Sequence, residues 1–255
     1  MTSVRHALTA GAAALVVLLA LLTATAGAGP VGWSVGLGCG LVLVVATSRA
    51  AAREQVTRMG PADLVTLSRA TLSCGVAALV AQSWSSATDV DPLVSLATLA
   101  LVLDAVDGRV ARATRTSSAF GGRLDGEADA FLMLVLSVHV AASAGTWVLA
   151  IGTVRYVFAA VGWWLPWMRA ALPPRYWRKV VTATAGIALT FAASDRGPVV
   201  AAYAGLVLAV LLLAESFGRD VCWLWCRRAT TTATTAPAVA TAPAATTAPA
   251  RAEAS

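Results

Sequence analysis

Four aspartates lie in two short stretches, Asp104-Ala-Val-Asp107 and Asp125-Gly-Glu-Ala-Asp129, next to strongly apolar sequence. If both stretches are helical, each pair lies on one face of its helix, because the spacings are i, i+3 and i, i+4. A short connection lets the two helices return antiparallel, so all four carboxylates can converge. Charges at the ends of membrane-spanning segments are costly and usually functional. The pattern therefore predicts a functional carboxylate site.

The chemistry of such a site follows from its charge. Four carboxylates close together repel one another unless a cation neutralises them. An all-oxygen cluster suits hard divalent ions such as Mg²⁺ or Mn²⁺, which often bind the phosphates of a substrate as well. Gly108 and Ala111 leave room for a substrate to approach the first helix. Arg112, together with Arg109 and Arg115, can hold phosphate oxygens in a bidentate fork.

These residues carry a resemblance to a known family. The pattern D-x2-D-G-x2-A-R-x8-G-x3-D-x3-D resembles the signature of the CDP-alcohol phosphotransferase (CDP-alcohol phosphatidyltransferase) family. Every fixed position is matched, by Asp104, Asp107, Gly108, Ala111, Arg112, Gly121, Asp125 and Asp129. A weaker match is the segment 61–69, which resembles the P-x-[ND]-x-[IVL]-T-x-x-R pattern near the nucleotide site of this family. The resemblance covers roughly residues 60–219.

The resemblance implies an enzyme of phospholipid biosynthesis that moves a phospho-alcohol group from a CDP-linked donor to an alcohol, with release of CMP. It implies six core helices, a homodimer and two Mg²⁺ or Mn²⁺ ions held by Asp104, Asp107, Asp125 and Asp129. Asp129 matches the proposed general base of the family. Gly108, Ala111, Arg112 and Gly121 would shape the nucleotide pocket.

The substrates are less closely determined. Because the site opens into the membrane, CDP-diacylglycerol is the expected donor, and the acceptor is a small polar alcohol. Glycerol 3-phosphate, inositol phosphate, serine or another lipid headgroup all remain open as the acceptor. Four further arginines slightly favour a phosphorylated acceptor, namely Arg109, Arg115, Arg123 and Arg155.

Three features leave alternatives open. Arg155 interrupts an apolar segment and should face the bundle interior, where it either binds an acceptor phosphate or pairs with a motif aspartate or with Glu127. Gly126-Glu127 departs from the Ser-Leu common in the family, and this extra carboxylate either tunes the acceptor pocket or faces the headgroups. Arg178 and Lys179 either contact an anion or anchor the chain at the membrane surface.

The composition indicates a membrane protein. Hydrophobic residues make up 58% of the 255 residues and charged residues only 13%, against about 25% in soluble domains. The net charge of +6 is spread through the connections between apolar segments and forms no basic patch with interleaved aromatic residues. Nucleic-acid binding is therefore not expected. The four cysteines form no C-x2-C pair, which argues against zinc.

We expect an all-α polytopic membrane protein in four parts. Residues 1–48 would form an N-terminal transmembrane hairpin, although the first apolar run alone could also be a signal peptide. Residues 49–69 would be a cytosolic interfacial segment, 70–228 the helical core and 229–255 a disordered tail rich in alanine, threonine and proline. Six apolar segments define the core, at 70–84, 93–103, 131–142, 147–163, 181–193 and 199–213. Several are shorter than a membrane span, so their helices should extend into the polar flanks.

The distribution of arginine and lysine predicts the orientation. Every second connection is strongly basic, whereas the alternate connections hold one arginine between them. The basic connections should be cytosolic, which places the aspartates at the cytosolic face of the plasma membrane.

Two other functions compete with this interpretation. One is an intramembrane prenyltransferase that uses Asp-bound Mg²⁺, but here both acidic pairs lie in one hairpin and carry the G-x2-A-R sequence. The other is a cation-coupled transporter, which predicts broken helices or inverted repeats. No convincing repeat is visible, and neighbouring arginines would oppose cation passage.

Overall fold

The computed structural model describes residues 2–86, 89–114, 118–170 and 176–234, with only the backbone described at 107–114, 119, 166, 169 and 229–234. Within this part of the chain there are eight α-helices. They are α1 (Val4–Ala26), α2 (Pro30–Arg53), α3 (Pro61–Ser83), α4 (Asp91–Thr114), α5 (Ala119–Ala144), α6 (Leu149–Trp164), α7 (Tyr176–Ala193) and α8 (Val199–Thr234). This confirms the predicted all-α fold of an N-terminal hairpin followed by six helices.

Short elements join and fix the helices. Two 3-10 turns, η1 (Thr146–Val148) and η2 (Pro166–Arg169), flank α6. Two short strands, β1 (Thr2–Ser3) and β2 (Arg58–Met59), pair antiparallel with Thr2 opposite Met59. The N-terminus is thereby held beside the start of α3. The hairpin turn between α1 and α2 begins at Gly27, whose φ of +67° is the left-handed conformation that favours glycine.

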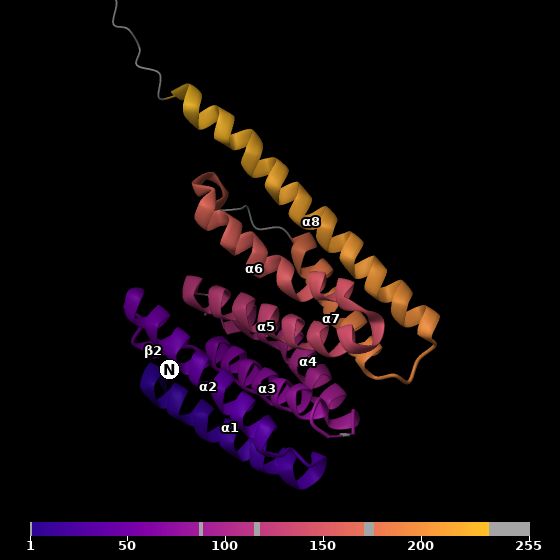
Figure 1. Cartoon of the computed structure of the whole chain (residues 1–255). Coiled ribbons are helices and arrows are strands. Elements are labelled where there is room, and N and C mark those ends of the chain that lie inside the picture. Colours follow the sequence, from indigo (N-terminus) through magenta and orange to yellow (C-terminus); the bar gives the residue numbers. More distant parts are fainter. Residues whose placement is uncertain (1, 87–88, 115–117, 171–175, 235–255) are drawn as a thin grey trace, which may run out of the picture.

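The helices form a bundle with α1 and α2 at one edge and the long α8 at the opposite edge (Figure 1). α3 lies inside and contacts α1, α2, α4 and α5, while α5 also contacts α6 and α7. The core crosses the bundle through fully buried leucines from four helices: Leu79, Leu132, Leu136, Leu189 and Leu206. α3 and α5 are therefore the helices that hold the two sides of the bundle together.

Six helical segments are long and apolar enough to cross a membrane. Among the described residues they are Val4–Ala26, Pro30–Arg53, Pro61–Ser83, Phe120–Ala144, Thr146–Trp164 and Val199–Arg228. α4 and α7 are not in this set. α4 carries Asp104 and continues into residues whose side chains are not described, and α7 has 18 residues with Arg178 and Lys179 near its start. The length and apolar composition of these six segments identify the chain as an integral membrane protein.

The helix ends differ from the apolar runs in the sequence. As expected, the helices continue into polar flanks: α5 begins at Ala119 although its apolar run begins at residue 131. Residues 49–69 divide between the end of α2, the strand β2 and the first turns of α3. α8 continues six residues into the segment predicted to be disordered, because alanine and threonine can propagate a helix that already exists. The rest of that tail, 235–255, lies outside the described residues.

Candidate active site

Three of the four predicted aspartates converge. Asp125 and Asp129 lie one turn apart on α5, and Asp104 faces them from α4. One carboxylate oxygen from each lies within 4.8 Å of the others. Their side chains are 24–36% exposed, so the cluster is open to a ligand. Three carboxylates at this separation form the all-oxygen donor set that Mg²⁺ and Mn²⁺ prefer.

The centre of the cluster is a buried arginine, Arg69 of α3. Its Nη1 lies 3.0 Å from an oxygen of Asp104 and 2.5 Å from an oxygen of Asp125, and its Nη2 donates to Asp129. The Arg69 side chain is only 2% exposed. α3 can place it here because α3 packs against both α4 and α5. One guanidinium thus contacts all three carboxylates and offsets one of their three negative charges.

Sequence reasoning placed Arg69 in a nucleotide-site pattern but missed that it pairs with the aspartates. Arg69 stands at the boundary between the polar segment 49–69 and the apolar run 70–84, so the sequence did not mark it as a buried arginine that needs a partner. Arg69 also precedes its partners Asp125 and Asp129 by 56 and 60 residues. Their meeting depends on helix packing that the sequence pattern does not specify.

The start of α5 is fixed against the start of α3. The hydroxyl of Ser118 caps α5 by accepting from the N–H of Gly121 at 2.8 Å. The Asp63 carboxylate caps α3 by accepting from the N–H of Gly60, also at 2.8 Å. Gly121 lies so close to Asp63 that a Cβ at this glycine would overlap a carboxylate oxygen. Gly121 is therefore a contact point between the two helices that carry Arg69, Asp125 and Asp129.

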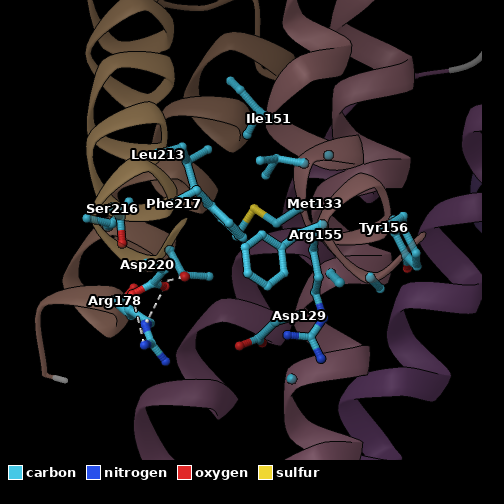
Figure 2. Close-up of a pocket in the computed structure, with 18 of the residues that line it drawn as sticks. Asp129, Met133, Ile151, Arg155, Tyr156, Arg178, Leu213, Ser216, Phe217 and Asp220 are labelled. Atoms are coloured by element: carbon cyan, nitrogen blue, oxygen red, sulfur yellow. Dashed lines mark hydrogen bonds and ion pairs between the residues drawn. The ribbon is translucent and has the colours of Figure 1, made fainter. Parts of the chain in front are cut away.

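A cavity of about 400 Å³ adjoins the cluster between α5, α6, α7 and α8. Figure 2 shows Asp129 at its charged end with Arg155, Arg178 and Asp220, while Met133, Ile151, Leu213 and Phe217 line the other end. Of the described aspartates in the cluster, Asp129 is the one that also lines this cavity. A molecule bound there would reach the carboxylate of Asp129.

Both arginines of the cavity are paired. Nη2 of Arg155 lies 2.7 Å from Oε1 of Glu127, which realises one of the two alternatives left open by the sequence. Nε and Nη2 of Arg178 each lie 3.0 Å from an oxygen of Asp220. Asp220 was not identified from the sequence, because an aspartate near the end of an apolar run gives no distinctive pattern. Arg178 thus lines the cavity and also lies near the start of α7, where the sequence suggested a membrane anchor.

The other predicted site residues divide into two groups. Arg123 pairs with Glu54 at the end of α2, and Gly121 lies at the α3–α5 contact. The backbone of five further residues belongs to α4, but their side chains lie outside the described part of the chain: Asp107, Gly108, Arg109, Ala111 and Arg112. Arg115 lies wholly outside it.

Comparison with known proteins identifies the family. No curated protein and no solved structure gives a significant match to the chain. The family model described as CDP-alcohol phosphatidyltransferase matches residues 59–216, which is more than half of the chain. The matched region begins just before α3 and ends within α8, so it contains Arg69, the three clustered aspartates and most of the cavity. The chain therefore belongs to the CDP-alcohol phosphatidyltransferase family.

Proposed function

We propose that the protein transfers a phosphatidyl group from CDP-diacylglycerol to the hydroxyl of a small polar alcohol and releases CMP. The family transfers such groups from a CDP-alcohol to an acceptor. The observation that carries the proposal for this chain is the convergence of Asp104, Asp125 and Asp129 beside a cavity lined by Asp129. This arrangement supports a cation site and an acceptor site that meet at one carboxylate.

Members of the family generally use a divalent metal. Asp104, Asp125 and Asp129 fit such a group through their clustered oxygens, and Asp107 would add a fourth carboxylate. Two Mg²⁺ or Mn²⁺ ions bound there would neutralise the diphosphate of the donor and the charge on departing CMP. Gly108, Ala111, Arg112 and Gly121 are proposed to shape the nucleotide pocket, as the pattern of the family implies.

Asp129 is proposed as the general base. It accepts the proton of the acceptor hydroxyl while the hydroxyl oxygen forms a bond to the phosphorus and the bond from phosphorus to the CMP oxygen breaks. Its place between the cluster and the cavity gives it access to both reactants. General bases typically contribute about 10²–10⁴-fold to a rate.

The residues around Asp129 keep its carboxylate in place. Arg69 donates to Asp125 and Asp129 from the buried side, which limits the positions that either carboxylate can adopt. The apolar end of the cavity excludes water from the acceptor side, since Met133, Ile151 and Phe217 form its wall. Both effects favour transfer to the alcohol over hydrolysis of the donor.

The membrane and the orientation are also proposals. The bundle end that carries Arg69 and Asp125 is the end with the basic connections, which supports a cytosolic site in the plasma membrane. A CDP-linked donor made inside the cell would reach it there. Homodimer formation rests on the resemblance alone, and the mass of the purified protein in detergent would test it.

The deciding experiment measures release of CMP from CDP-diacylglycerol by the purified full chain with Mg²⁺ or Mn²⁺ and a panel of alcohols. We expect metal-dependent release that Asp129→Asn lowers at least about 100-fold. Asp91→Asn is the matched control, since Asp91 pairs with Arg196 at the opposite end of the bundle. Equal loss in both variants, or release from the donor without any metal, would overturn the proposal.

A further inference from the structure

Two residues of α5 accommodate one guanidinium group. Glu127 pairs with Arg155, and Gly126 leaves the space in which that guanidinium lies. A Cβ at Gly126 would meet Nη2 of Arg155 at 3.1 Å and its Cζ at 3.4 Å. Gly126 and Glu127 therefore act together on Arg155.

The second arginine of the cavity is held more firmly. Arg178 faces Asp220 through two nitrogen–oxygen distances of 3.0 Å, and the Asp220 side chain is only 7% exposed. Nη2 makes the hydrogen bond of this pair, and Nε adds a close ionic contact. Separating the pair is costly, because the buried acid would be left without a partner. Asp220 therefore offsets the charge that Arg178 would offer to another anion.

The two cations of the described cavity wall, Arg155 and Arg178, each face a carboxylate, Glu127 and Asp220. The third carboxylate of the wall, Asp129, belongs to the proposed metal site, whose ions would offset its charge. A phosphate group placed in this cavity would therefore compete with Glu127 for Arg155. This competition disfavours it.

We infer that Glu127, by pairing with Arg155, makes the cavity selective for an acceptor alcohol without net negative charge. Such an acceptor is a neutral polyol or a zwitterionic amino alcohol, whose hydroxyl and ammonium groups can contact the paired side chains without separating them. The inference rests on the proposed function. It runs against the slight sequence-based preference for a phosphorylated acceptor, which rested in part on Arg123 and Arg155, both paired with a carboxylate here.

The kinetic test compares matched acceptors. Release of CMP is measured with glycerol against glycerol 3-phosphate, and with inositol against inositol 1-phosphate. The unaltered protein should prefer the unphosphorylated member of each pair. Glu127→Gln should raise the relative kcat/KM for the phosphorylated member by about tenfold, through its KM, because one repulsive charge is removed and Arg155 gains a vacant side. Substituting Arg155→Gln as well should abolish that gain.

Glu215→Gln is the matched control. Glu215 pairs with Arg219 outside the cavity, so its loss should leave the acceptor ratio unchanged. An unaltered protein that prefers the phosphorylated acceptors, or a Glu127→Gln variant with an unchanged ratio, would overturn the inference.

A binding measurement separates this inference from the proposed reaction. Glycerol 3-phosphate should raise the unfolding temperature of Glu127→Gln more than that of the unaltered chain, and the double variant should lose this effect. If no alcohol supports CMP release but glycerol 3-phosphate still stabilises Glu127→Gln more than the unaltered chain, the proposed reaction fails. The selectivity of the cavity against anions then still holds. If glycerol 3-phosphate stabilises the unaltered chain and Glu127→Gln equally, the selectivity is refuted whatever the reaction.

Discussion

Arg69 faces three carboxylates with a single guanidinium group, although it is only 2% exposed. The arrangement is balanced only in part, because Asp104, Asp125 and Asp129 carry three negative charges against one positive charge. A divalent cation at the open side of the cluster would complete the neutralisation. Arg69 and a bound metal therefore share the same task, and each should matter more when the other is removed.

Arg69→Gln tests this relation. Without the guanidinium, the metal-free protein should lose about 3 kcal/mol of its free energy of unfolding, because three clustered carboxylates are left without a cation. Added Mg²⁺ should then raise the unfolding temperature of the variant more than that of the unaltered protein. Thermal unfolding in detergent, with and without a chelator, measures both effects.

The control for this prediction is Arg196→Gln. Arg196 pairs with Asp91 where both side chains are more than half exposed, so its loss should cost less than about 1 kcal/mol. A Mg²⁺-induced shift of the same size in Arg69→Gln and the unaltered protein would show that Arg69 and the metal do not share the cluster.

At the scale of the helices, the contact between α3 and α5 decides how Arg69 meets the aspartates. Asp63 and Gly121 lie at the site end of this contact, and the Ser118 and Asp63 caps fix both helix starts there. A shift of α5 away from α3 would separate Arg69 from Asp125 and Asp129. Helix packing at Gly121 therefore controls the geometry of the site from one turn away.

Gly121→Ala should disturb this contact. The added Cβ overlaps the Asp63 carboxylate, which cannot swing away without losing its bond to Gly60. We expect a loss of about 1–3 kcal/mol in the free energy of unfolding and a lower rate of CMP release. Both are measured on the purified protein.

The adjacent glycine is the matched control for the same helix turn. A Cβ at Gly122 would meet nothing within 4 Å, and alanine favours a helix by up to about 1 kcal/mol over glycine. Gly122→Ala should thus be neutral or slightly stabilising and fully active. Equal losses in the two variants would indicate that the start of α5 tolerates no alanine, and that the Asp63 contact is not the cause.

The helices themselves were largely predictable, and their contacts were not. Six apolar runs after a hairpin gave the number and order of the helices, and the i, i+4 spacing placed Asp125 and Asp129 together correctly. The partners of Arg69 could not be predicted because they lie on other helices. The spacing of residues in a single sequence does not show which helices pack against one another. For the same reason Glu127 was only one of several partners considered for Arg155.

At the scale of the whole molecule, the first described residues and the C-terminal end of α8 lie on the side of the site. β1 pairs with β2 just before α3, and α8 continues past Asp220, which faces Arg178 near the start of α7. With 36 residues, α8 is about 54 Å long at 1.5 Å per residue, which exceeds the roughly 30 Å hydrocarbon core. Its C-terminal end extends past the neighbouring helices (Figure 1), so we expect its last turns to lie beyond the hydrocarbon core on that side.

Two native cysteines near the C-terminal end of the membrane segment of α8 can report the orientation. Cys222 and Cys226 are exposed, whereas Cys74 is buried and Cys39 half-buried within the apolar helices. If the site faces the cytosol, a membrane-impermeant maleimide should label the protein in inside-out vesicles and leave it unlabelled in intact cells. The physical reason is the strong excess of arginine at this end, since positively charged connections remain on the cytosolic side.

The control moves the thiol to the other end of the bundle. Ser85→Cys, in a chain with Cys222 and Cys226 replaced by serine, places a thiol at the exposed end of α3. Intact cells should label this variant. The opposite labelling of both proteins would show that the topology is inverted and that the aspartates face the outside of the cell. A nucleotide-linked lipid made inside the cell could not reach them there without transport. Labelling thus decides whether a cytosolic CDP-linked donor is accessible to this site.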